Sequence, residues 1–163
     1  MEAQTNGNHV IDEIVQLDPD PANALEYMKV FTSAQATRTA IYHEFEHAIE
    51  DHANGSIGVP EIQQVIRIAQ EGFQDVSSEI IHVERVLVSL GLIHLSNIIR
   101  QVQDLEREKL EVTVNLLSFQ IQATSRPEIS YESVIDDLKA KRQALIDKIN
   151  EAMENARADM LDL

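Results

Sequence analysis

Apolar residues recur along most of this chain with the spacing of helices that bury one side. Between Pro60 and Gly91 the apolar positions alternate in steps of four and three. This 3.5-residue period is typical of a helix that packs lengthwise against other helices. The seam consists of Ile62, Ile66, Ala69, Phe73, Val76, Ile80, Val83, Leu87 and Leu90. The pattern predicts one long helix, with Phe73 in the middle of its buried seam.

Similar patterns predict three further long helices. Asp20 suits the cap and Pro21 the first turn of a helix that reaches about residue 52. Two more helices are expected over about 93–123 and 130–160. Short turns make sequential helices antiparallel. We therefore expect an all-α fold, a long antiparallel helical bundle or coiled coil of about four long helices.

Two basic residues interrupt the predicted seams, Lys109 in the third helix and Arg142 in the fourth. We interpret them as polar residues that set the register of the helices, either paired with acids on facing helices or at the edge of the bundle. The alternative is that they contact a partner. Residues 21–163 are expected to form a single helical-bundle domain. Residues 1–20 are expected to be a loose N-terminal segment, in which His9 to Leu17 can form a short helix.

Composition and charge narrow the classes of function. The chain has only five Gly and four Pro, too few for an all-β fold with its frequent turns. Its 13 basic and 28 acidic residues give a net charge of −15. Proteins that bind duplex DNA need clustered Lys and Arg to neutralise phosphates, and this chain lacks such clusters. We therefore expect no tight direct binding to nucleic acid.

The absence of cysteine excludes disulfides, zinc–thiolate sites and cysteine nucleophiles. No run of about 18 apolar residues is present, so no membrane span is expected. The first residues lack the basic and apolar regions of a signal peptide. These features predict a protein of the nucleus, the cytosol or both.

Two histidine-containing patterns are candidates for metal chemistry. The sequence from His43 to His47 formally matches the HExxH pattern of zinc proteases, although the third ligand of the extended motif is missing. Glu44 with His47, and Glu79 with His82, form Glu-x-x-His steps of the kind used in di-iron bundles. These histidines lie away from the apolar seams, which favours surface histidines. We expect no catalytic residue, metal or cofactor, and a metal-dependent helical enzyme is the unfavoured alternative.

Two segments carry a resemblance to a known family. Residues 31–42 have the form F-x-x-A-Q-x-x-R-x-x-x-Y, and residues 106–113 the form E-R-x-K-L-E-x-T. Both resemble the "required for excision" B-type (Rex-type) DNA-repair domain family of eukaryotes, over about residues 25–160. The signature positions in this sequence are Phe31, Ala34, Gln35, Arg38, Tyr42, Lys109 and Leu110.

The resemblance implies involvement in DNA repair, by excision, without an assigned catalytic activity. We therefore predict a non-catalytic acidic adaptor that contacts other proteins, such as basic repair or chromatin proteins, and that is able to form a homodimer. A structural coiled-coil protein without a repair role is the alternative. Phe31, Ala34, Arg38 and Tyr42 follow one helical stripe, so the signature serves either the core or a partner. Gln35 and Arg38 are placed to hydrogen-bond across the bundle.

Overall fold

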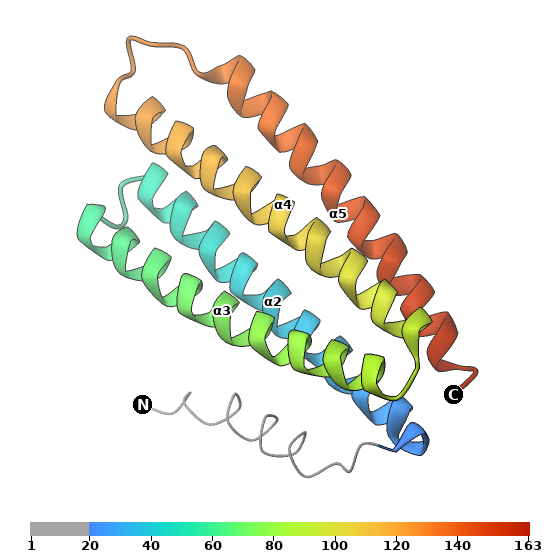
Figure 1. Cartoon of the computed structure of the whole chain (residues 1–163). Coiled ribbons are helices and arrows are strands. Elements are labelled where there is room, and N and C mark those ends of the chain that lie inside the picture. The colour runs from blue at the N-terminus through green and yellow to red at the C-terminus, as the bar shows by residue number, and fades with distance from the viewer. Residues whose placement is uncertain (1–19) are drawn as a thin grey trace.

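A computed structural model describes residues 20–163 of the chain, and the predicted helix from His9 to Leu17 lies outside this part. The described residues form four long α-helices and one short 3-10 helix, without a β-strand (Figure 1). This confirms the all-α fold predicted from the sequence. The elements are η1 (Pro21–Asn23), α2 (Ala24–Ala53), α3 (Val59–Ser89), α4 (Ile93–Ser125) and α5 (Glu132–Met160).

The helices begin and end at the residues that the sequence singles out, to within a few positions. The side chain of Asp20 accepts a hydrogen bond of 2.9 Å from the Ala22 N–H, as a cap before Pro21 should. Gly55 and Gly91, in the turns after α2 and α3, have φ angles of 81° and 74°. This left-handed conformation is accessible to glycine at little cost.

Helix α5 begins later than the sequence predicted, at Glu132 rather than Ser130. The preceding residues form a turn instead, in which the Ile129 N–H donates to the Arg126 carbonyl over 3.1 Å. Pro127 lies inside this turn and cannot donate a backbone hydrogen bond. The helix therefore starts only after the turn is complete.

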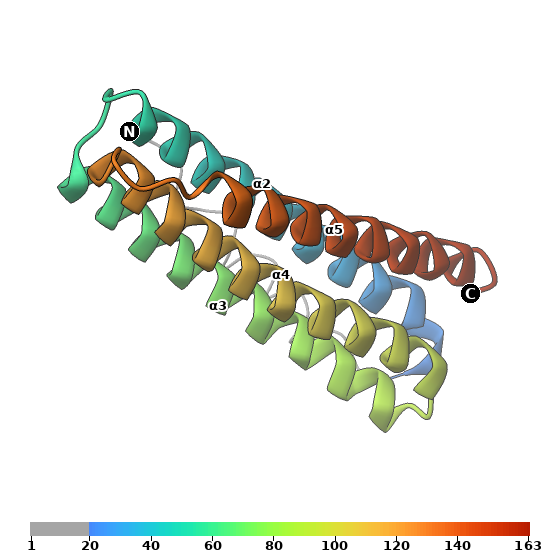
Figure 2. The same cartoon turned by 90° about the horizontal axis from the view of Figure 1, so that it is seen from above.

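The four helices run antiparallel to their sequence neighbours, and they pair unequally (Figures 1 and 2). Helix α2 packs along α3, and α4 packs along α5, over most of their lengths. Helices α3 and α4 have fewer close approaches, and α2 and α5 meet only over a short stretch. None of the helices formed by residues 20–163 combines the length and the apolar character needed to cross a bilayer.

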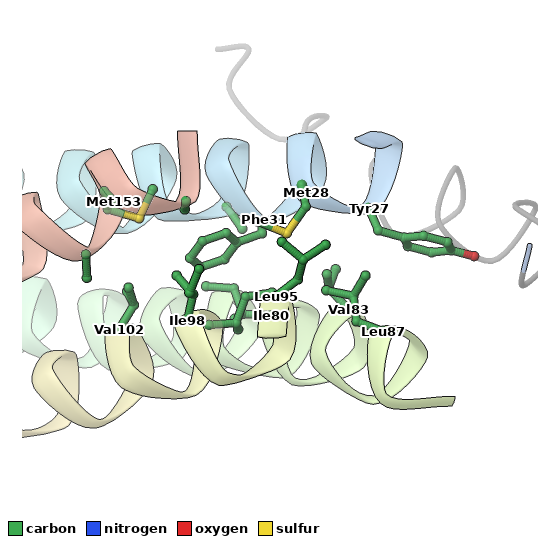
Figure 3. Packing of buried hydrophobic residues seen from close by; sticks show 14 of the residues in the cluster. Tyr27, Met28, Phe31, Ile80, Val83, Leu87, Leu95, Ile98, Val102 and Met153 are labelled. Carbon is green, nitrogen blue, oxygen red and sulfur yellow. The ribbon is translucent and has the colours of Figure 1, made fainter. Parts of the chain in front are cut away.

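The core consists of two apolar clusters (Figure 3 shows the larger). Every residue of the predicted α3 seam is buried or partly buried, so the 3.5-residue period is confirmed. Gly72 lies beside this seam, and a Cβ atom there would come within 2.9 Å of the Ile41 side chain. The glycine therefore lets α2 and α3 approach closely at this point, at a helix-propensity cost of about 1 kcal/mol.

Helix α4 is buried on a wider face than its predicted seam. The seam predicted for this helix consists of Leu95, Ile98, Val102, Leu105, Lys109, Val112, Leu116, Phe119 and Ala123. Besides the seam, five further residues are buried: Ser96, Ile99, Glu106, Thr113 and Leu117. The reason is that α4 contacts α2, α3 and α5, whereas a single seam serves one interface. The pattern of apolar residues does not reveal this second face, because three of its five members are polar.

Phe73 tests the predicted seam at its centre. Its side chain is 7% exposed and its ring centroid lies 4.5 Å from that of Tyr42. We expect Phe73→Ala to lower the free energy of unfolding by about 3–5 kcal/mol, because it removes a buried ring and leaves a cavity. Urea denaturation measures the loss. The exposed His47 provides the control, since His47→Ala should change the free energy of unfolding by less than about 0.5 kcal/mol. If the two variants changed it equally, the prediction that Phe73 lies in a buried seam would be wrong.

Candidate functional site

A layer of polar side chains crosses the middle of the bundle between the two apolar clusters. Four signature or motif residues form its centre: Gln35 and Arg38 on α2, and Glu106 and Lys109 on α4. Their exposed fractions are only 5%, 3%, 5% and 8%, respectively. The Gln35 side-chain amide donates a hydrogen bond to Oε1 of Glu106. The structure thus brings together two motifs that lie 71 residues apart in the sequence.

Arg38 joins three helices through its guanidinium group. Nη1 donates to Oε1 of Gln35 over 3.0 Å, on its own helix. Nη2 donates to the hydroxyl of Ser77 on α3 over 3.1 Å and to Oε1 of Gln103 on α4 over 2.7 Å. Because buried polar groups are costly when unpaired, these bonds are what allow an arginine to occupy the interior. Gln35 and Arg38 therefore hydrogen-bond across the bundle, as their spacing suggested.

Lys109 pairs differently from the expectation for a basic residue on the seam. Its Nζ lies 3.2 Å from Oε2 of Glu106, one turn away on the same helix, rather than beside an acid on a facing helix. Nζ also lies 3.9 Å from the ring centroid of Tyr42, a cation–π contact with α2. The other seam residue, Arg142, does pair across the bundle, with Glu46 of α2 at 2.6 Å.

Charge is unevenly balanced in this layer, because one buried carboxylate, Glu106, faces two buried cations. Burial lowers the pKa of Arg38 and of Lys109, and the nearby charge of Glu106 opposes both shifts. Burial, and next the Glu106 charge, raise the pKa of Tyr42, so its hydroxyl stays protonated at physiological pH. Glu106 therefore supplies the negative charge that the buried cations of this layer require.

The other signature positions lie in apolar surroundings. Phe31 and Ala34 belong to the larger apolar cluster. Leu110 is partly buried and packs against the smaller cluster. Sequence reasoning did not single out Glu106 or Thr113, although both stand in the second motif. Thr113 is fully buried and donates a hydrogen bond of 2.7 Å to the Lys109 carbonyl.

Two cavities flank the polar layer. The larger cavity, of about 510 Å³, lies between α2 and α5 and is also lined by residues of α4; Gln35, Glu106 and Lys109 are among its lining residues. The smaller, of about 230 Å³, opens between α3 and α4 and reaches Arg38 and Glu106. The signature residues therefore form the partition between two openings on different sides of the bundle. Both cavities are lined by a mixture of polar and apolar side chains.

The histidine patterns do not come together into one site. His43, Glu44 and His47 are exposed on α2, and His82 is exposed on α3. Glu79 is partly buried, with its Oε1 shielded from solvent and lacking a hydrogen-bond partner. Within residues 20–163, no three His, Asp or Glu side chains gather closely enough to hold a metal ion.

Comparison with known proteins adds to this geometry. The family described as DNA repair REX1-B matches residues 26–120, which include both motifs. A curated relative, the heterochromatin silencing protein rss1 of Schizosaccharomyces pombe, is 28% identical over 127 residues, which cover 78% of this chain and 92% of the relative. No solved structure matches the chain significantly.

Glu106 is the residue whose loss should unbalance the polar layer. We expect Glu106→Gln to lower the free energy of unfolding by about 3–5 kcal/mol, because it leaves two buried cations without a counter-charge. Adding Lys109→Met should restore part of that loss by removing one of the cations. Chemical denaturation of the single and double variants measures both effects. Glu108→Gln, at an exposed neighbouring position, is the matched control. If the loss of stability in the double variant equals the sum of the losses in the two single variants, Glu106 and Lys109 are not energetically coupled.

Glu79 should make stability depend on pH in a specific direction. Burial raises its pKa above the usual value. The neutral form of Glu79 therefore contributes to the stability of the folded state. This contribution is fully present at pH values below the pKa of Glu79 in the unfolded chain, about 4.3. It is lost as the pH rises through the higher pKa of Glu79 in the folded chain, because the buried side chain then ionises. Glu79→Gln should therefore raise the melting temperature at pH 7, with the gain disappearing near pH 4. The exposed Glu71 on the same helix is the control, because Glu71→Gln should show no such difference.

Proposed function

We propose that this chain, which belongs to the DNA repair REX1-B family, supports DNA repair or a related chromatin process as a non-catalytic adaptor. The family name concerns DNA repair, and that of the curated relative concerns heterochromatin silencing. Both processes take place on chromatin, which favours the nucleus over the cytosol as the site of action. Within this proposal, we assign the protein more specifically to excision repair.

The observation that carries the adaptor role is the burial of the family signature. Gln35, Arg38 and Lys109 direct their polar groups to one another and to Glu106, inside the bundle. A catalytic group must be free to act on a substrate, whereas these side chains, although they line the two cavities, are engaged in hydrogen bonds, ion pairs and a cation–π contact with one another and with their neighbours. This supports a protein that offers a rigid surface to partners and leaves the chemistry to them.

Charge indicates what kind of partner the outer surface suits. On α4, the exposed acids Asp104, Glu108 and Glu111 follow one stripe at steps of four and three, within the family match. Asp104 pairs with Arg107 at 3.1 Å, whereas Glu108 and Glu111 have no ion pair within the described chain. Electrostatic complementarity speeds association and selects partners of opposite charge. We therefore propose that this stripe contacts a basic segment of a repair or chromatin protein, and not bare DNA.

Complementation in the native cell tests the proposal. We expect the Glu108→Lys, Glu111→Lys double variant to keep its melting temperature, because both side chains are exposed. It should nevertheless fail to restore survival after DNA damage, and repair or chromatin proteins that purify with the wild-type chain should be lost. The Glu108→Asp, Glu111→Asp variant keeps the charge and should behave as wild type.

Several results would contradict this function. If cells that lack the protein survive damage and maintain silencing normally, the chain has a structural role without a part in repair. If the purified chain binds naked duplex DNA with sub-micromolar affinity at about 150 mM salt, direct contact with phosphates would replace the proposed protein contact. If stoichiometric metal remains bound after purification and is lost in His47→Ala, the metal-enzyme alternative would be revived.

A further inference from the structure

The cavity between α2 and α5 is elongated, and its two walls differ in character. One wall is α2 from Thr32 to Glu46, and the other is α5 from Arg142 to Arg157. The two arginines lie fifteen positions apart in the sequence, which corresponds to roughly 22 Å along the helix axis. Since α2 and α5 meet only over a short stretch, the space between them forms a groove with α4 as its floor. We refer to it as the α2–α5 groove.

The α5 wall has cations at its ends and apolar residues between them. Arg142, Ile146, Ile149, Met153 and Arg157 line the groove at steps of four, three, four and four, so they share one face of the helix. Of its apolar residues, only Ile146 is partly exposed, whereas Ile149 and Met153 are 5% exposed and reach the groove at the edge of the larger apolar cluster. The opposite wall combines three small side chains, those of Thr32, Ala36 and Thr39, with four larger ones from the same helix.

The groove is cationic in a strongly acidic protein. Lys109, Arg142 and Arg157 line it, against the two carboxylates Glu46 and Glu106. Glu106 is already committed to the buried layer, and Glu46 pairs with Arg142, whose side chain is 23% exposed. Arg157 is exposed and has no hydrogen bond or ion pair within residues 20–163. One end of the groove therefore has a free cation, and the other has a cation held by an exchangeable surface acid.

We propose that the α2–α5 groove binds an extended peptide segment of a partner protein that carries acidic residues on both sides of a short apolar stretch. Roughly seven residues of extended chain span the distance between the two arginines. The apolar side chains of the segment contact Ile146 and the groove-facing edges of Ile149 and Met153, and its acids pair with Arg142 and Arg157. The acid near Arg142 replaces Glu46 as the partner of the guanidinium group.

This site is distinct from the acidic stripe on α4 and goes beyond the adaptor role proposed above. The stripe selects a basic partner, whereas the groove selects an acidic and apolar one. Two surfaces of opposite charge would let one chain hold two different proteins at once. Because the groove lies on α2 and α5, substitutions on its α5 wall leave the α4 stripe intact, so either proposal can fail without the other.

Selection from a random peptide library tests the groove without knowledge of the partner. The full chain serves as bait for displayed peptides of about 12 residues, which are longer than the groove requires. The selection is done at about 150 mM salt, because only charges within roughly 8 Å of each other then interact strongly. We expect enrichment of peptides with acids flanking apolar residues. An enriched peptide is then synthesised, and fluorescence polarisation measures its binding to the wild type and to three variants.

The variants separate the groove from overall charge. Arg157→Glu should weaken binding at least about tenfold, because it places a like charge beside the peptide acid. Glu46→Gln should strengthen binding, because it removes the acid that competes for Arg142. Lys148→Glu changes the net charge as much as Arg157→Glu does, but nine residues away, on the opposite face of α5. It should alter binding by less than about twofold.

Three outcomes would overturn the proposal. The first is a library that enriches nothing, or that enriches basic peptides. The second is a peptide whose affinity falls equally in Lys148→Glu and Arg157→Glu, which would reduce the effect to net charge. The third is an acidic peptide whose binding is unchanged in both Arg157→Glu and Glu46→Gln, which would place its site elsewhere on the molecule.

Discussion

The middle of this bundle depends on one buried carboxylate. Glu106 supplies the negative charge beside two buried cations, Arg38 and Lys109, and it also accepts a hydrogen bond from Gln35. Cations removed from water are stable only when they are paired and hydrogen-bonded. Since Gln35 and Arg38 are on α2 and Glu106 is on α4, these bonds tie together two helices that are not neighbours in the sequence. We infer that they fix the register of one helical hairpin against the other.

This polar layer also decides what is left for function. The apolar clusters on either side of it provide most of the stability, because burial of apolar surface is the dominant favourable contribution to folding. The layer adds specificity of arrangement, and its outer edges form the inner walls of both neighbouring cavities. The family signature is therefore best understood as a scaffold, with binding proposed at the surfaces that the scaffold holds in place.

Much of the fold could be predicted from the pattern of apolar residues. The α3 seam, the turn residues and the stripe that contains Phe31, Arg38 and Tyr42 all lie where their spacing indicated. The polar site was only partly predictable. The second motif contains Glu106 and Lys109, but spacing along one helix cannot show that Lys109 pairs with Glu106 rather than with an acid opposite. The groove between α2 and α5 was not predictable, because it depends on how closely two helices approach.

The sequence by itself determined that the chain is helical and acidic, because helix periodicity and net charge are properties of neighbouring residues and of composition. It also determined the family, through two short motifs on separate helices. Only the tertiary structure decided that these motifs meet in one buried layer. Contacts between residues 71 positions apart follow from the packing of whole helices. The same packing left α5 close to α4 but apart from α2, which is why a groove and its cations face outward there.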